Sequence, residues 1–256
     1  MSSYLRRLKI ALFGHKNSHT SLIGQRNLRV LRALRHEHNS TEYSVESTKP
    51  DNLLHFQQPT NLDREAVWRA QGLGLDDVTL VFVPLVQFKR KVLPMLLQVL
   101  VNLWRQDAKL LVVGGEPDLL PRCKAWTLAT GLTSQMQYAD KHSDVCRLLY
   151  ATNAFLLPSL YEVFPLATLE AAATGLPLLT TPLDSVEEYL KDGHDGLLIA
   201  LALKRTTAAL ERFLSLTPAR RRELGMRVAH DTQKYDEARF LCTWRSFYQG
   251  IDRVRL

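Results

Sequence analysis

Short apolar runs alternate along most of the chain with longer segments in which apolar residues recur every three or four positions. Short runs bounded by turn residues are typical of buried strands, and the longer spacing is typical of helices that cover a sheet. The runs predict strands at residues 78–83, 109–113, 136–138, 154–157, 178–181 and 197–199. The other segments predict helices at residues 64–71, 94–104, 119–130, 142–151, 207–214, 218–232 and 238–249, and one that begins at Pro165 and ends before Gly175. This alternation predicts an α/β fold, a doubly wound parallel sheet.

The N-terminal part of the chain carries a separate and shorter pattern. An apolar run at residues 8–13, a helical pattern at residues 22–35 and a second run at residues 41–45 predict a β-α-β segment. The polar, irregular stretch that follows is typical of a linker. We therefore expect a domain boundary near residue 50, with a short basic β-α-β segment at residues 1–50 and the main domain at residues 51–256.

The formal net charge of +7 is concentrated at the N-terminus. Residues 1–40 hold eight bases and one acid, which leaves 25 bases and 25 acids in the remainder. A basic end favours an anionic partner such as a membrane surface, a nucleic acid or a phosphorylated ligand. The arginines beside the apolar face of residues 22–35 suit a helix that lies on an anionic membrane. An ordinary surface helix with its arginines in water is the interpretation we favour.

Cysteine usage and the first residues indicate the compartment. Cys123, Cys146 and Cys242 lie far apart with no C-x-x-C pair, which favours free thiols in a reducing compartment over disulfides or a zinc site. The apolar run near the start is too short for a signal peptide or a membrane span. We expect a cytoplasmic protein, with peripheral contact to the inner face of a membrane as an extension of that expectation.

Candidate chemistry gathers where strands are expected to end. Glu162 follows the strand at residues 154–157, and Glu170 lies eight residues later in the helix that begins at Pro165. The N-terminus of a helix is a ready anion site, so one mouth would hold two carboxylates and a positive dipole. Lys89, Arg90 and Lys91 precede another helix, where a basic loop suits a diphosphate; a solvated basic turn is the alternative. Ligands of such sheets bind at the carboxyl ends of the strands, where these residues stand.

A family resemblance rests on two ordered motifs. The stretch EVFPLATLE from Glu162 to Glu170 resembles the E-x7-E motif of the retaining family-4 (group 1) glycosyltransferases. The stretch SVEEYLKDGHDG from Ser185 to Gly196 resembles the next signature of that family, which ends in D-G-x-x-G. The resemblance covers about residues 52–248 and implies the Rossmann-like, nucleotide-sugar-binding C-terminal domain of a GT-B fold. Residues 1–50 would then be a truncated remnant of the acceptor domain.

The resemblance also implies roles around the E-x7-E motif. Glu170 would accept hydrogen bonds from the ribose hydroxyls of the nucleotide, and Glu162 would contact hydroxyls of the donor sugar near its anomeric carbon. Backbone amides of Phe164 and Leu166 would face the phosphates, on either side of Pro165, which has no N–H. In place of the usual glycine after Glu162, this chain has a valine.

The other implied contacts come from neighbouring loops. Lys89 or Arg90 would take the place of the family's phosphate-binding lysine, whereas Pro84 and Leu85 occupy the positions of its glycine and arginine.

Gly114 and Gly115 form a tight turn that permits close approach of a ligand. Tyr138 begins the loop that holds the nucleobase in the family, largely through backbone atoms.

The resemblance therefore implies a transferase that moves a sugar from a nucleotide diphosphate sugar, UDP- or GDP-linked, to a glycan or lipid-linked acceptor with retention, as in polysaccharide biosynthesis. No cofactor and no metal are expected, because a helix dipole and basic side chains can stabilise the leaving diphosphate. A partner chain or a homodimer would complete the acceptor site. The alternative is an inactive glycosyltransferase-like domain that acts as a binding or structural subunit. An unrelated nucleotide-binding protein is the weakest interpretation, since the chain has neither G-x-G-x-x-G nor a P-loop.

Overall fold

The computed structural model describes residues 63–74, 76–85, 93–103, 105–115, 117–139, 145–162 and 165–235, together with Cys242 and Ser246. The β-α-β segment expected at residues 1–50 lies outside the described residues, as does the helix expected at residues 238–249, apart from Cys242 and Ser246, which are helical. Contacts group residues 53–233 into one compact unit and residues 1–52 with 234–256 into another. The helices and strands below belong to the unit of residues 53–233, apart from the 3-10 turn at its end, and the domain boundary near residue 50 stays a prediction.

A single parallel sheet of six strands organises this unit. The strands are β1 (Val78–Leu85), β2 (Ala108–Gly114), β3 (Met136–Ala139), β4 (Ala154–Leu157), β5 (Leu178–Thr180) and β6 (Gly196–Leu198). They are ordered β3-β2-β1-β4-β5-β6, and every neighbouring pair is parallel. This confirms the doubly wound α/β fold. The order reverses between β1 and β4, and such a switch point is where open α/β sheets bind ligands.

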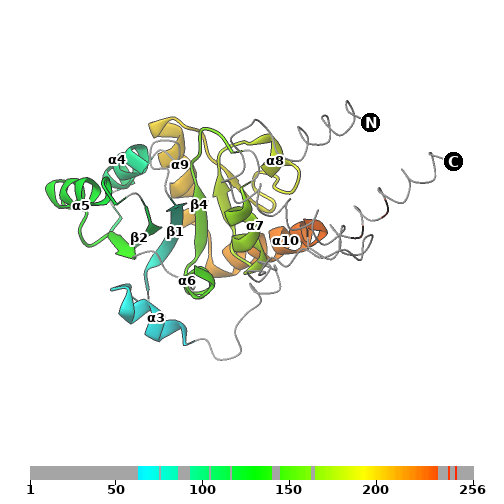
Figure 1. Cartoon of the computed structure of the whole chain (residues 1–256), viewed down its shortest axis with the longest axis horizontal. Helices are drawn as coiled ribbons and strands as arrows, with labels where there is room; N and C mark the ends of the chain where they lie inside the picture. The colour runs from blue at the N-terminus through cyan, green and yellow to red at the C-terminus, as the bar shows by residue number, and fades with distance from the viewer. Residues whose placement is uncertain are drawn as a thin grey trace, which may run out of the picture. The chain divides into compact units, whose positions relative to one another are not determined.

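Helices cover both faces of the sheet. They are α3 (Arg64–Ala70), α4 (Leu93–Leu103), α5 (Leu120–Ala129), α6 (Val145–Ala151), α7 (Leu166–Ala173), α8 (Asp184–Glu187), α9 (Leu203–Leu214) and α10 (Pro218–Thr232), followed by the 3-10 turn Gln233–Tyr235. Helix α4 packs against α9, α7 against α10 and α3 against α6. Figure 1 shows α4 and α9 on one side of β1 and β4, and α3 and α6 on the other.

The strands are mostly apolar because most of their residues are buried on both faces of the sheet; the half-buried Lys109 of β2 and Gln137 of β3 are exceptions. In β1, Leu80 and Phe82 belong to the core cluster that includes Leu96 of α4 and Phe213 of α9, while Val81 between them is also fully buried. Strands covered on both faces read as continuous rather than alternating apolar runs. This is why the sequence pattern located them.

Helix α9 begins at Leu203, one turn before the expected start at residue 207. The added turn carries the exposed Lys204 and Arg205, which the apolar pattern assigned to a loop. Thr206 in the same turn is buried, and its hydroxyl donates to the carbonyl oxygen of Ala200. Tertiary contact thus extends the helix beyond its apolar stripe.

Helix α3 closes the carboxyl end of α6. Arg64 donates from Nε to the carbonyl oxygen of Ala151 over 3.4 Å and from Nη2 to that of Thr152 over 3.2 Å. The indole N–H of Trp68 also donates to Ala151, and the Arg64 guanidinium lies over the Trp68 ring at 4.7 Å. The last carbonyl groups of a helix have no partner within it, so these side chains supply the missing donors.

Candidate functional site

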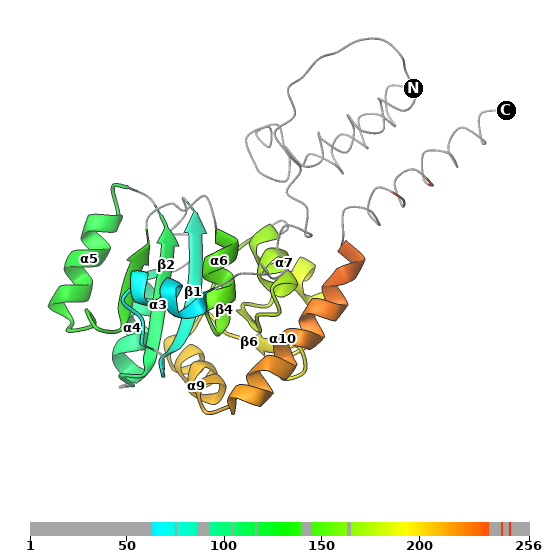
Figure 2. The ribbon, with the colours of Figure 1, turned by 90° about the horizontal axis from the view of Figure 1, so that it is seen from below.

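The carboxyl edge of the sheet collects most of the residues expected in the site. Figure 2 shows the arrowheads of β1 and β2 directed to the same edge. Because all six strands are parallel, the loops after β1, β2 and β4 leave from this one edge. The glycine pair at the end of β2, Glu162 after β4, and Pro165 with Leu166 at the start of α7 therefore share it. Lys89, Arg90 and Phe164 lie outside the described residues.

A network of hydrogen bonds fixes the start of the loop after β4. Ser159 is only 1% exposed, and its backbone N–H donates to Oγ1 of Thr181 over 3.2 Å. The Thr181 hydroxyl in turn donates to the carbonyl oxygen of Ser159 over 2.6 Å. The Ser159 hydroxyl lies 3.1 Å from Oε1 of Glu162 and 3.2 Å from the carbonyl oxygen of Tyr161. The side chain of Glu162 is thus tied to the buried end of β4.

Helix α7 begins directly after this loop. Pro165 is its N-cap residue, with φ −77° and ψ 88°, and its own side chain makes no capping hydrogen bond. The Thr168 hydroxyl donates to the carbonyl oxygen of Pro165 over 2.6 Å and also contacts the Tyr189 hydroxyl. Leu169, Ala171 and Ala172 are buried, whereas Glu170 itself is half-buried. The second carboxylate therefore stands one turn into a helix whose N-terminus carries a partial positive charge.

A hollow of about 520 Å³ opens at the carboxyl ends of β4, β5 and β6. Its wall comprises Ser159, Leu160, Thr181, Pro182, Asp192, Leu198, Ile199, Ala200, Leu201 and Arg205. This volume falls in the range of small-molecule sites. Three large apolar residues at this edge are well exposed: Leu160 at 64%, Tyr161 at 60% and Leu201 at 37%. The sequence had placed Asp192 of this wall in the D-G-x-x-G motif but did not single out the segment after β6, although its position after a strand was the available signal.

Gly114 and Gly115 both adopt backbone angles that favour glycine. Their φ values are 73° and 129°, in a region that L-residues with a Cβ rarely enter. The turn after β2 therefore requires glycine for its own geometry.

The side chain of Tyr138 is directed into the packing of α5. Its hydroxyl is 2.7 Å from Oγ1 of Thr127, and Lys124 lies over its ring at 5.7 Å. Burial raises the pKa of this phenol. We therefore expect any contact of Tyr138 with a nucleobase to come from its backbone.

The D-G-x-x-G turn has a structural explanation. Asp192 accepts from the backbone N–H of Leu198 over 2.9 Å and from Arg212 over 3.4 Å. Asp195 is completely buried and accepts from the backbone N–H of Lys191 over 3.2 Å. A Cβ on Gly196 would lie 2.3 Å from the backbone oxygen of Leu178. The motif sets the entry of the chain into β6.

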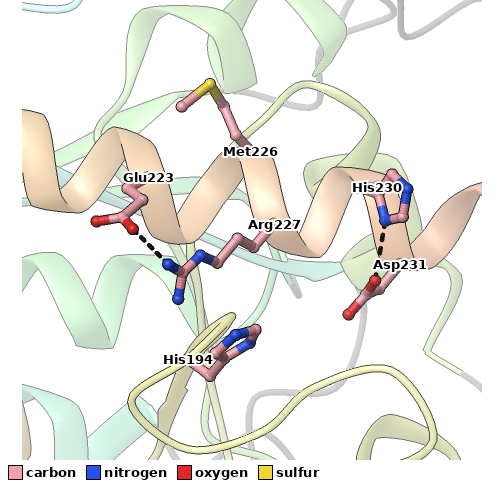
Figure 3. A pocket seen from close by; sticks show the side chains of 6 residues that line it. All are labelled: His194, Glu223, Met226, Arg227, His230 and Asp231. Atoms are coloured by element: carbon pink, nitrogen blue, oxygen red, sulfur yellow. Dashed lines mark hydrogen bonds and ion pairs between the residues drawn. The ribbon is translucent and has the colours of Figure 1, made fainter.

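A second hollow, of about 390 Å³, lies between α10 and the turn before β6 (Figure 3). It is lined by His194, Glu223, Met226, Arg227, His230 and Asp231. Both of its carboxylates have basic partners: Glu223 accepts from Arg220 and Arg227, and Asp231 accepts from His230. The hydrogen bond from Arg220, with the charges of Arg220, Arg227 and His194, lowers the pKa of Glu223. This hollow lies at the amino end of β6, whereas the residues expected in the site lie at the carboxyl ends of the strands. We therefore do not assign it to the candidate site.

Two further properties concern the described residues alone. Within them, no group of three or more histidine, cysteine, aspartate or glutamate side chains is arranged to hold a metal ion. No helix in the same part of the chain has the length and apolar character needed to cross a membrane.

Comparison with known proteins gives one family match and several relatives. The family model described as "Glycosyl transferases group 1" matches residues 77–215, from just before β1 to the end of α9. The N,N'-diacetylbacillosaminyl-diphospho-undecaprenol alpha-1,3-N-acetylgalactosaminyltransferase of Campylobacter jejuni is 27% identical over 133 residues. That alignment covers 52% of this chain but 35% of the relative. The chain therefore spans about a third of that relative's length.

Solved structures share the fold. The structure of Anabaena HepE in complex with UDP and glucose superposes with a TM-score of 0.68 at 12% identity, covering 78% of this chain and 54% of HepE. The C-terminal domain of a group 1 family glycosyl transferase, LpcC from Francisella tularensis, superposes with a TM-score of 0.62 at 17% identity, covering 73% of this chain and all of that domain. The described unit thus matches a C-terminal domain of GT-B architecture.

Proposed function

Given that the chain belongs to the glycosyl transferases group 1 family, we propose that it binds a nucleotide diphosphate sugar at the carboxyl edge of its sheet and transfers the sugar to an acceptor with retention of anomeric configuration. One observation carries this proposal. The loop with Glu162, the N-terminus of α7 and the hollow of about 520 Å³ adjoin at the end of β4, next to the switch point of the sheet. Glu162 suits the sugar, the N-terminus of α7 suits the diphosphate, and Glu170 suits the ribose of the nucleoside.

Each group has a proposed task. Glu170 accepts from the two ribose hydroxyls, since a carboxylate can take two adjacent donors in charge-assisted bonds. Glu162 accepts from hydroxyls of the donor sugar. The amides of Phe164 and Leu166 and the dipole of α7 face the phosphates, and Lys89 or Arg90 neutralises the diphosphate as it leaves. With these groups the transfer proceeds without a metal ion.

A UDP-linked donor is the form with the most support. HepE has been solved with UDP and with UDP-glucose, on a fold that this chain shares. GDP-linked donors remain the second form to test, because the nucleobase loop relies on backbone atoms and the Tyr138 side chain packs elsewhere.

The acceptor is proposed to be a lipid-linked or free glycan. The Campylobacter jejuni relative is named for a diphospho-undecaprenol substrate, which favours a lipid-linked acceptor. The basic N-terminus then brings the protein to the inner face of a membrane by charge. A partner chain or a second copy is proposed to complete the acceptor site.

A second candidate function is supported by two departures from the family pattern. Leu85 stands where the family has an arginine, and Val163 stands where it has a glycine. Loss of the arginine removes charge from the diphosphate site, and the valine restricts the approach of the donor. A domain that binds the nucleotide but does not turn over would serve as a binding or structural subunit.

The test is calorimetric titration of UDP, GDP and ADP into the wild type and Glu170→Ala at fixed salt. Binding of one nucleotide that Glu170→Ala abolishes, and that the exposed helical control Glu211→Ala preserves, is the expected result. Release of free sugar or of UDP from a bound UDP-sugar then separates the two candidates, because the inactive subunit binds without turnover. No binding of any of the three nucleotides would contradict both.

A further inference from the structure

We propose that Ser159, itself held by Thr181, is a positioning residue that fixes the carboxylate of Glu162 toward the donor sugar. The proposal rests on the proposed function for its sugar-binding part. The contact that it needs, between the Ser159 hydroxyl and Oε1 of Glu162, is 3.1 Å long.

The first step is the way in which Thr181 continues the sheet beyond its last strand pair. The β4–β5 ladder ends with Leu157 opposite Thr180. One residue further, the Thr181 hydroxyl both accepts from the backbone N–H of Ser159, over 3.2 Å, and donates to its carbonyl oxygen, over 2.6 Å. A single side chain thereby satisfies both backbone groups of Ser159. Since Thr181 is 3% exposed and Ser159 1%, these bonds are shielded from water.

The second step leads from Ser159 to the loop. With its backbone held from β5, Ser159 points its hydroxyl at Glu162, three residues later. A serine hydroxyl has one proton, so it is shared between the Glu162 carboxylate and the carbonyl oxygen of Tyr161, 3.2 Å away. The bond to the carboxylate is charge-assisted and therefore the stronger of the two. The buried end of β4 thus orients a side chain in an otherwise irregular loop.

The third step is the consequence for sugar binding. A glutamate side chain on a loop has three rotatable bonds, and ordering it costs conformational entropy when the ligand arrives. A hydrogen bond from a buried, immobile donor lowers that cost before binding. Ser159 and Thr181 both line the hollow of about 520 Å³, so the hydrogen bonds that orient Glu162 lie along its wall. Their effect should fall on the sugar and leave the nucleotide unaffected.

The experiment compares UDP and UDP-glucose as probes. Ser159→Ala and Thr181→Val remove one hydroxyl each, and Thr181→Ser keeps it. Thr180→Val is the matched control, because the Thr180 hydroxyl is also fully buried but donates to the carbonyl oxygen of Thr181. We expect Ser159→Ala and Thr181→Val to weaken UDP-glucose by roughly 3- to 10-fold with UDP unchanged. Thr181→Ser and Thr180→Val should bind both probes as the wild type does.

A double-mutant cycle shows whether Ser159 acts through Glu162. Adding Ser159→Ala to Glu162→Ala should weaken UDP-glucose by less than about twofold, because the group that the serine positions has gone. The proposal would be overturned if Ser159→Ala weakened UDP-glucose binding as much in Glu162→Ala as in the wild type. It would also be overturned if Ser159→Ala weakened the binding of UDP and of UDP-glucose equally.

The unfolding temperatures of the four proteins in this cycle, the wild type, Ser159→Ala, Glu162→Ala and the double variant, give a readout that needs no ligand. Groups that bond to each other give non-additive shifts on mutation, whereas independent groups give additive ones. Additive shifts would overturn the Ser159–Glu162 contact itself. If the shifts are non-additive but the wild-type protein binds neither UDP nor UDP-glucose, the Ser159–Glu162 contact stands. Its role in sugar binding and the proposed function are then both overturned.

Discussion

Gly225 of α10 lies directly against the carbonyl oxygen of Gly175, the residue that follows α7 and its C-cap. A Cβ on Gly225 would be 1.9 Å from that oxygen and 3.1 Å from Cδ of Pro177. The backbones of α10 and of the turn between α7 and β5 are therefore in contact, with no side chain between them. This contact fixes the C-terminal end of α7, the helix that carries Glu170.

Gly225→Ala should destabilise the protein for that reason. Overpacking of this kind costs about 1–3 kcal/mol, which outweighs the gain of about 1 kcal/mol that alanine usually brings to a helix interior. Denaturant unfolding measures the difference. Met226→Ala, on the same helix with a side chain that is 65% exposed, should stay within about 0.5 kcal/mol of the wild type. An increase in stability for Gly225→Ala would show that α10 is free to move away.

Tyr189→Phe should change how stability depends on alkaline pH. Burial raises the pKa of the Tyr189 phenol, and the hydrogen bond with Thr168 acts in the opposite direction. Above the ordinary value of 10.0, the unfolded chain loses this proton while the folded protein keeps it. The folded state then binds more protons, so the stability present below pH 10 falls as pH rises.

Unfolding of the wild type and Tyr189→Phe at pH 8, 10 and 11 tests this dependence. Near pH 8 the phenylalanine variant should be less stable by about 1 kcal/mol through the lost hydrogen bond. The gap should shrink at pH 11, by up to about 1.4 kcal/mol per pH unit. Thr168→Val, which removes the same bond but keeps the phenol, should retain the alkaline loss. A constant gap across the series would contradict the buried, protonated phenol.

Gly114→Ala should lower both stability and nucleotide affinity. A Cβ at φ 73° costs about 1–2 kcal/mol and would also stand at the carboxyl edge, where the proposed nucleotide binds. Gly131→Ala is the matched control, with φ 72° and open space around its Cβ, at the turn before β3. Both variants should lose similar stability, measured by denaturant unfolding, but only Gly114→Ala should weaken UDP. Equal UDP affinities would remove the glycine pair from the site.

Tyr138→Phe should affect stability and leave nucleotide binding unchanged. The substitution removes the hydroxyl that bonds to Thr127 of α5, which costs about 1 kcal/mol. Calorimetric titration of UDP into this variant should give the affinity of the wild type. Thr127→Val, which removes the other partner, should give the same two results. Weaker UDP binding with unchanged stability would place the Tyr138 side chain against the nucleobase after all.

The sequence was most informative where local pattern and burial coincide. All six strands lie within two residues of their expected limits, because strands covered on both faces are largely apolar. Helix α10 has the expected bounds, and α7 begins where Pro165 and the apolar spacing indicated. Helix α9 was misjudged at its start, since its first turn is polar and exposed there and is held by a buried threonine.

The contacts that shape the candidate site could not be found in the same way. Ser159 and Thr181 are 22 residues apart and meet only because β4 and β5 are neighbours in the sheet. Tyr138 was assigned to the nucleobase loop by its position in the chain, which stays a prediction; the packing of its side chain against α5 could not be predicted from that position. The positions of residues after strands were predictable, whereas the directions of their side chains depend on tertiary packing.

The attachment of α3 to α6 determines where this module could be cut for a domain exchange. The family match begins at residue 77, after α3 has ended at Ala70. A chimera joined there would lack Arg64 and Trp68, and the carbonyl groups of Ala151 and Thr152 would lose their donors. The transferable piece therefore starts at Asp63, the N-cap of α3, even though the family match starts later.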